Sequence, residues 1–235
     1  MDQYTELSTL EEKLNCTFKE LNISYLPKFL SNILGLIKNK DYDTYTHLIR
    51  VSLLGEKVGK LINSYDIIDF KTKDFFLACL LHDTGKLYRK SESLCKIKGF
   101  NKQDMEDMKK HPVDGYYLLK QISYVQDKDI FDFSAEITLR HHRYKKEEPY
   151  PENIQGYEKN KTRKTKEELE FYSRVLSIVD FYDSLKNRRN DRYSKKNIFG
   201  EIKLLKSEKA KKIILSNFPE DWDFIDELYD QEIFK

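Results

Sequence analysis

Residues that form turns and residues that form sulfur cross-links are both scarce in this sequence. Its 235 residues include 8 glycines and 5 prolines, too few for an all-β chain with a turn about every ten residues. Its three cysteines, Cys16, Cys79 and Cys95, are odd in number and form no Cys-x-x-Cys pair. We therefore expect neither a disulfide framework nor a thiolate zinc site, and a reduced, cytoplasmic setting.

Long apolar runs and an excess of charge of one sign are also missing. The longest apolar run, 75–81, is about a third of the roughly 20 residues that cross a bilayer, and the N-terminus is too acidic and polar for a signal peptide. The 42 Lys and Arg nearly balance the 40 Asp and Glu, which leaves a formal net charge of +2. We therefore expect neither a membrane nor duplex nucleic acid as a partner, and the oligomeric state stays open.

Aromatic residues, in contrast, are plentiful. They make up 13% of the chain, far too many for a disordered protein. Apolar residues recur at helical spacing along most of the sequence, which predicts an all-α fold. The predicted helices cover approximately 7–38 (two helices that break near Pro27), 41–62, 75–82 (with Asp74 as N-cap and Gly85 near its end), 102–110, 112–121, 135–142, 167–186 and 198–215, followed by a short helix after Pro219, with 86–101 mostly loop.

The positions of the five histidines are more informative than their number. A single histidine on a helix is usually an ordinary core or surface residue. Here, however, His82 and Asp83 together close an apolar helix, and two further histidines end another. Asp180 lies in the apolar run VLSIVDFY, where a carboxylate is costly to bury unless another charge compensates it. The full set of histidines is His47, His82, His111, His141 and His142.

A metal centre would supply that compensating charge. Imidazoles and carboxylates together suit divalent Mn, Fe, Co, Ni or Zn. So many ligands exceed the needs of one ion, which indicates two ions with Asp83 as the bridge, a site able to activate water for attack on phosphorus. Asp43 and Arg50 share a helix face with His47. Asp43 is a further candidate ligand, although the helix dipole explains an acid at a helix start equally well.

These residues, in this order, resemble the HD superfamily of metal-dependent phosphohydrolases. The sequence is most similar to the HD-GYP branch, whose known members hydrolyse cyclic dinucleotides such as cyclic di-GMP. LLHDTGKL is close to the LLHDIGK block of that branch, and IVDFYDSL resembles its valine-alanine-aspartate, tyrosine-aspartate-alanine-leucine helix. LCKIKGFNKQDMEDMKKHPVDG follows its lysine-glycine turn, acidic helix and His-Pro-x-x-Gly joint, while Arg192, Tyr193 and Lys195 resemble its Arg-Pro-Tyr-Lys ending. The resemblance covers residues 41–196.

One loop departs from the pattern of the branch. Where the branch has His-His-Glu-x-x-Asp-Gly-x-Gly-Tyr-Pro, this chain reads HHRYKKEEPYP over 141–151. Tyr150 and Pro151 are kept, as is Gly156 further on, whereas Arg143 replaces the glutamate and Lys146 the aspartate. Arg143 thus removes a hydrogen-bond acceptor and adds a candidate phosphate-binding cation. The basic stretch 159–166 that follows is either a solvated loop or a flap that attracts phosphate.

The resemblance implies a role for each matched residue. Asp83 would bridge the ions and orient a hydroxide, and Lys86 would neutralise a phosphate oxygen, so these two are the predicted catalytic residues. Arg50, Arg143 and Tyr150, together with Lys86, are candidate substrate contacts. The implied ligands of two or three ions are His47, His82, Asp83, His111, His141, His142 and Asp180, with Asp43 as the additional candidate.

The predicted function is hydrolysis of a nucleotide second messenger. The substrate would be a cyclic dinucleotide of the cyclic di-GMP or cyclic GMP-AMP type, or a related small nucleotide, and a metal-bridged hydroxide would attack its phosphorus. The alternatives are a generic HD phosphohydrolase of nucleotides or short oligonucleotides, and a decayed module that only binds nucleotide. The expected organisation is an N-terminal helical segment over 1–40 packed on the core, a phosphohydrolase domain over 41–196 of HD-type helical-bundle fold, and a C-terminal helical extension over 197–235.

Overall fold

The structure, a computed structural model, describes most of the chain. Several residues named above lie outside the described part: Cys95, Gly156, Arg192, Tyr193 and most of the stretch 159–166. The described residues are 3–23, 27–94, 99–126, 129–146, 148–154, 157, 164–187, 195–196, 202–203 and 205–235.

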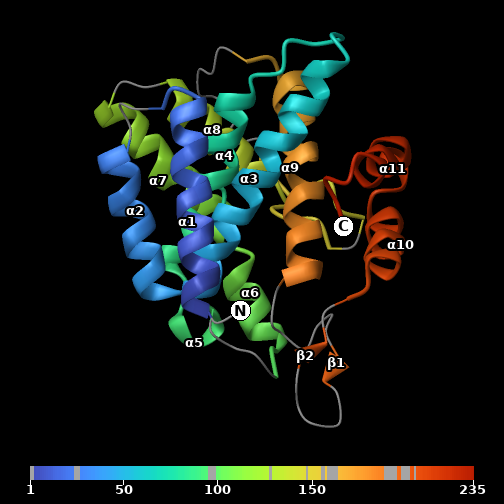
Figure 1. The fold of residues 1–235 in the computed structure, drawn as a ribbon. Helices are drawn as coiled ribbons and strands as arrows, with labels where there is room; N and C mark the ends of the chain where they lie inside the picture. Colours follow the sequence, from blue (N-terminus) through green and yellow to red (C-terminus); the bar gives the residue numbers. More distant parts are fainter. Residues whose placement is uncertain are drawn as a thin grey trace.

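Helices form most of the described structure, and the predicted all-α class is confirmed (Figure 1). A short antiparallel ladder pairs β1 (Lys195–Lys196) with β2 (Ile202–Lys203). Within the described ranges, no helix combines the length and apolarity needed to cross a bilayer. The helices are α1 (Gln3–Glu20), α2 (Pro27–Lys40), α3 (Tyr42–Ser64), α4 (Thr72–Leu81), η1 (Thr84–Tyr88), α5 (Ser91–Leu94), α6 (Lys102–Met108), α7 (His111–Gln126), α8 (Asp129–Arg140), α9 (Lys166–Asn187), α10 (Ser207–Asn217), η2 (Pro219–Asp221) and α11 (Trp222–Asp230), where η marks a 3-10 helix.

Helix α4 is buried between two hydrophobic clusters. Phe75 and Cys79 face the first cluster, which includes side chains of α9 and the C-terminal helices. Phe76 and Leu80 face the second, which includes side chains of α1 and α2. Because both faces are covered, the helix needs no polar side, and its sequence TKDFFLACLL is apolar after the first turn. The end of α4, with His82 just after it, therefore lies inside the fold.

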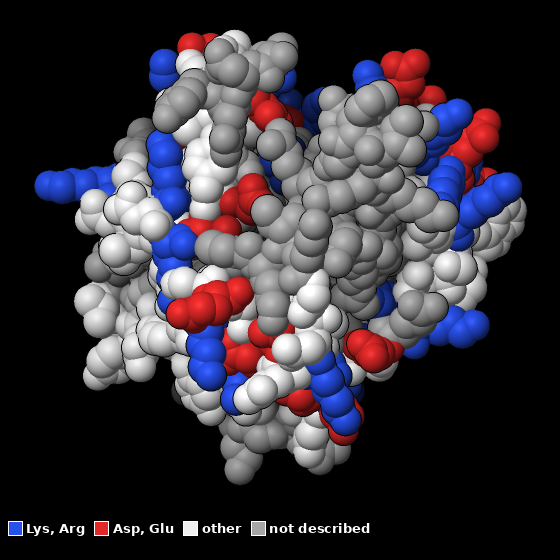
Figure 2. All heavy atoms as spheres, turned by 90° about the horizontal axis from the view of Figure 1, so that it is seen from below, with Lys and Arg blue, Asp and Glu red and all other residues white. Residues whose placement is uncertain are grey.

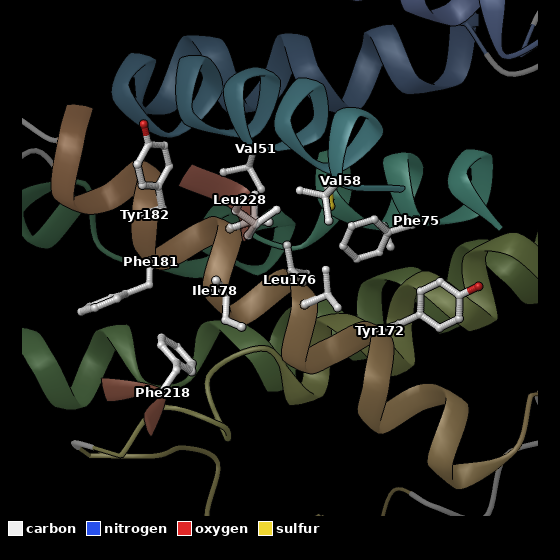
Figure 3. Close-up of a cluster of buried hydrophobic side chains, with 14 of the residues drawn as sticks. Val51, Val58, Phe75, Tyr172, Leu176, Ile178, Phe181, Tyr182, Phe218 and Leu228 are labelled. Carbon is white, nitrogen blue, oxygen red and sulfur yellow. The ribbon is translucent and has the colours of Figure 1, made fainter. Parts of the chain in front are cut away.

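The C-terminal helices α10 and α11 complete the first cluster against α9. Figure 3 shows two side chains of the C-terminal segment, Phe218 and Leu228, in this cluster. Phe218 packs against Phe181 of α9, with ring centroids 5.8 Å apart. Tyr182 stacks on Phe234 at 3.8 Å, and Leu228 is fully buried. Burial of each large apolar side chain stabilises the fold by about 1.5–3 kcal/mol. This segment is therefore part of the core.

The N-terminal helices α1 and α2 pack on α3, away from α10 and α11 (Figure 1). Leu14 and Leu30 bury their side chains in the second cluster beside Leu48 of α3. The hydroxyl of Tyr45, also on α3, donates a hydrogen bond of 2.6 Å to Glu11 of α1. Burial and this carboxylate both raise the pKa of Tyr45. The contact ties α1 to the helix that carries His47.

Two sequence predictions of local structure are wrong. The helix predicted over 198–215 begins only at Ser207, because the β-branched Ile202 lies in strand β2. Asp74 is not the N-cap of α4, since the Phe75 amide donates to the Lys71 carbonyl and the helix begins a turn earlier, with Lys71 as N-cap. The segment 86–101, predicted as mostly loop, holds the end of η1 and the short helix α5, and its residues 95–98 lie outside the described part of the chain.

Candidate metal centre

Seven of the eight predicted ligands meet at one place, and they come from five separate helices or helix ends. Their candidate ligand atoms form three overlapping groups, and within each group all atoms lie within 4.8 Å of one another. All of these residues are buried apart from His142, whose side chain is 22% exposed. They are His47 of α3, His82 and Asp83 at the end of α4, His111 at the start of α7, His141 and His142 after α8, and Asp180 of α9.

Asp83 lies between two sets of imidazoles. Its Oδ2 is 3.6 Å from His47 Nε2 and 3.5 Å from His82 Nε2. Its Oδ1 is 3.0 Å from His111 Nε2 and 3.9 Å from His141 Nε2. One carboxylate therefore presents one oxygen to each side, which is the arrangement that a bridging ligand needs.

Asp180 adds a second carboxylate on the side of His47. Its Oδ1 is 3.0 Å from His47 Nε2 and 3.7 Å from His82 Nε2. Its Oδ2 is 3.9 Å from His142 Nδ1, on the other side of the centre. The hydroxyl of Ser177, one turn earlier on α9, donates to the His141 carbonyl. That hydrogen bond connects α9 to the end of α8.

Three imidazoles are oriented by carbonyls at helix ends. His82 Nδ1 lies 2.7 Å from the Cys79 carbonyl at the end of α4. His111 and His141 form the same bond with the residue three positions earlier, at the ends of α6 and α8. A carbonyl only accepts, so each Nδ1 carries the proton and each Nε2 keeps a lone pair. The last carbonyls of a helix have no intrahelical partner, which leaves them available for this role.

His47 is oriented by a carboxylate that the sequence analysis missed. Its Nδ1 donates to Asp183 Oδ2 at 2.7 Å. Arg50 binds the same carboxylate with two nitrogens, at 2.8 and 3.0 Å, and Asn187 donates to it at 2.7 Å. Burial raises the pKa of Asp183, but Arg50 and His47 outweigh burial and lower it to about 2. Asp183 follows Asp180 by one helical turn and belongs to the matched stretch IVDFYDSL, but neither feature assigned it a role in the sequence.

The pKa shifts of His141, Asp83 and Asp180 favour the protonation states that metal ligands need. Burial and the neighbouring His82 lower the pKa of His141 to about 3, so this imidazole is neutral at pH 7. Burial would raise the pKa of Asp83, but Lys86 and the adjacent imidazoles hold it well below its usual range. Burial would also raise the pKa of Asp180, but hydrogen bonds with His47 and His82 outweigh burial and lower it well below its usual range. Neutral imidazoles beside ionised carboxylates are the forms that bind divalent ions.

Two further observations show that these residues fit a bound cation. His111 Nε2 and His141 Nε2 lie 3.3 Å apart, and both carry lone pairs because their protons are on Nδ1. Among the described residues, His82 Nε2 and Asp83 Oδ1 have no hydrogen-bond partner although both are buried. Buried acceptors that face one another are unfavourable unless a cation lies between them. The donor set therefore suits a divalent transition metal.

Lys86 is buried next to the carboxylate of Asp83. It lies in η1, and its Nζ donates to Asp83 Oδ2. Gly85 allows η1 to approach α7 closely, because a Cβ at this position would overlap the His111 carbonyl and the Gly115 nitrogen. The close approach brings Lys86 and His111 to the same centre.

The remaining predicted residues lie around the centre or away from it. Asp43 is exposed in the first turn of α3 and belongs to none of the three groups. Arg50 binds Asp183, as described above. Arg143 Nη1 donates to the Pro151 and Glu152 carbonyls, at 3.1 and 3.3 Å. The Tyr150 ring lies on the imidazole of His142.

Comparison with known proteins gives two matches. The family model described as "HD domain" matches residues 44–185, well over half of the chain, and this segment contains all seven assembled residues. The cyclic di-GMP phosphodiesterase response regulator RpfG of Xanthomonas campestris pv. campestris (strain 8004) is 27% identical over 187 residues. That alignment covers 77% of this chain but only 43% of the relative, so the chain spans less than half the length of this protein.

Proposed function

The chain belongs to the HD domain family, and from this membership we propose that it is a metal-dependent phosphodiesterase that hydrolyses a cyclic dinucleotide or a related nucleotide second messenger. The observation that carries the proposal is the position of Asp83, with one oxygen toward each set of imidazoles. Two ions bound on either side would supply a nucleophile at neutral pH and neutralise the charge that develops on phosphorus.

The side chains divide into two ligand groups that share Asp83. The first group has two carboxylates and the second has one, so the first group is the more negative and would bind its ion more tightly. Mn, Fe, Co, Ni and Zn all suit this mixture of nitrogen and oxygen ligands. The first group is His47, His82, Asp83 and Asp180, and the second is Asp83, His111, His141 and His142.

Lys86 would act on the phosphate. Its ammonium is buried beside Asp83, where the low dielectric strengthens electrostatic interactions. A fixed cation in such a site stabilises negative charge that grows on a phosphate oxygen in the transition state. The same ammonium holds the Asp83 carboxylate in place. Lys86 thus orients the bridging ligand and is available to stabilise the phosphate.

The choice of a small nucleotide as substrate has two supports. The relative named above is a cyclic di-GMP phosphodiesterase. On the described part of the face seen in Figure 2, Lys and Arg are interspersed with Asp and Glu and do not form a continuous basic stripe. Binding to duplex nucleic acid depends on such a stripe. A small nucleotide that reaches the buried centre fits these observations better.

Purified protein loaded with Mn²⁺ or Fe²⁺ and incubated with a panel of substrates tests the proposal. The panel holds cyclic di-GMP, cyclic GMP-AMP, linear nucleotides and a short RNA, and His82→Ala serves as the matched inactive control. We expect turnover of at least one cyclic dinucleotide and none by the variant. Turnover of linear nucleotides or RNA alone would assign a generic phosphohydrolase, while bound ions without any turnover would assign a nucleotide-binding module.

A further inference from the structure

His142 differs from the other four imidazoles in how its ring is held. The ring of each of the others is oriented by a hydrogen bond from Nδ1 to a carbonyl or to Asp183. No described residue forms a hydrogen bond with the ring of His142, and its Nδ1 lies 3.9 Å from the nearest carboxylate oxygen, on Asp180. It is also the most exposed of the assembled residues, at 22%. Something else must therefore orient this ring.

The ring of Tyr150 fills that role by stacking. Its centroid lies 4.5 Å from that of His142, with an angle of 32° between the two planes. The His141 ring packs against His142 at 4.0 Å. The Tyr150 amide also donates to the His142 carbonyl, at 3.3 Å. Tyr150 thus contacts both the backbone and the ring of His142, and its ring limits how far the imidazole can rotate.

Arg143 holds the loop that carries Tyr150. Its Nη1 donates to the carbonyls of Pro151 and Glu152, the two residues after Tyr150. Its own amide donates to the Arg140 carbonyl at the end of α8, at 2.9 Å. Arg143 therefore connects the end of α8 to the far side of the loop. A charged donor makes these bonds stronger than neutral ones of the same length.

We propose that Tyr150 is a positioning residue for His142 and that Arg143 keeps Tyr150 in place. The inference rests on the proposed two-ion centre and assigns to both residues a role other than the substrate contacts expected from the sequence. Stacking takes the place of the hydrogen bond that each of the other imidazoles has. Loss of either residue should then weaken ion binding by the second ligand group, which contains His142. Ion binding by the first group should not change.

Metal titration without substrate tests this inference. Metal-free protein is titrated with Co²⁺, with calorimetry to count the binding events and visible absorption to report the ligand field of each ion. In Tyr150→Ala and in Arg143→Ala we expect the second ion to bind about 10-fold more weakly, at the lower end of what loss of a group that orients a ligand causes. The first ion should bind as in the wild type. Tyr150→Phe and Arg143→Lys, which keep the ring and the donor, should bind the second ion within a few-fold of the wild type.

Two controls separate positioning from other effects. Lys146→Ala removes a positive charge from the same loop and should leave the affinity for both ions unchanged. The double variant Arg143→Ala, Tyr150→Ala should bind the second ion no more weakly than either single variant, because both act on the same ring. Additive losses would show that the two residues act separately and would contradict the proposed connection.

The other outcomes overturn the inference. Unchanged affinity for the second ion with a raised KM would make Arg143 and Tyr150 substrate contacts and not positioning residues. An equal loss of affinity for both ions would indicate a general loss of structure. A wild-type protein that binds no second ion would overturn the two-ion function together with this inference. Two ions bound with wild-type affinity by both alanine variants would overturn the inference alone.

Discussion

Asp183 shows why some residues of the centre cannot be recognised from sequence. It orients His47 and holds Arg50. Those partners lie more than 130 positions earlier in the chain, so only the folded structure brings them together. His82, His141 and His142 each stand beside an acid or another histidine, and Asp180 lies in an apolar run, whereas the ligand roles of His47 and His111 came from the resemblance to the HD superfamily. Arg50, expected on the phosphate, instead has its guanidinium on Asp183.

The variant Asp183→Asn tests this role. The amide keeps the size of the side chain but removes the charge that faces Arg50 and fixes His47. We expect the first ion to bind about 10- to 100-fold more weakly and the metal-free protein to lose about 3 kcal/mol of stability, because Arg50 is left partly buried without its partner. Calorimetric titration and urea unfolding measure the two effects.

The control for this variant is Asn187→Ala, which removes a neutral donor from the same carboxylate. This variant should reduce the affinity for the first ion far less than Asp183→Asn does. If Asp183→Asn binds both ions with wild-type affinity, then Asp183 does not orient His47.

Helix ends, more than helix faces, build the centre. The ends of α4, α6 and α8 each supply a carbonyl that orients one imidazole. Helices with a regular apolar face, such as α3 and α9, could be predicted to within a few residues. The end of α8 could not, since the predicted helix 135–142 includes two histidines that lie just beyond Arg140. Propensity does not determine which residue ends a helix when tertiary contacts at that end decide it.

Gly85 tests how closely the helices η1 and α7 pack. In Gly85→Ala the new methyl would overlap backbone atoms of His111 and Gly115, which cannot move without separating the two elements. We expect a loss of about 3 kcal/mol in the free energy of unfolding, measured in urea.

A matched glycine-to-alanine substitution in α2 should stabilise the protein instead. Gly35 lies in α2, and a Cβ there would meet no atom within 4 Å. Because alanine is the better helix former, Gly35→Ala should stabilise the protein by up to about 1 kcal/mol. Equal effects of the two variants would mean that η1 and α7 are not closely packed.

At the scale of the whole molecule, the core extends beyond the segment that the HD family model matches. The match ends at residue 185, yet side chains of α10, α11 and the last residues belong to the first hydrophobic cluster. The sequence predicted C-terminal helices over 197–235 but could not show which helix they would contact. The structure places them against α9 (Figure 3). This helix carries Asp180 and Asp183.

Leu228 and Trp222 test whether this segment stabilises the fold. Leu228 of α11 is fully buried, whereas Trp222 is 56% exposed. Leu228→Ala should reduce the free energy of unfolding by about 3 kcal/mol, because it leaves a cavity in the cluster. Trp222→Ala should change it by less than about 1 kcal/mol. Comparable losses in urea unfolding would show that α11 is not packed as described.

The central claim is that Asp83 joins two ion sites, and anomalous diffraction from crystals of the Mn²⁺-loaded protein tests it most directly. Asp83→Asn, which keeps the shape and loses the charge, provides the comparison. We expect two anomalous peaks in the wild type, one near each oxygen of Asp83, and fewer than two in the variant. A single peak, no peak, or ions bound only at exposed acidic residues in the wild type would contradict the claim.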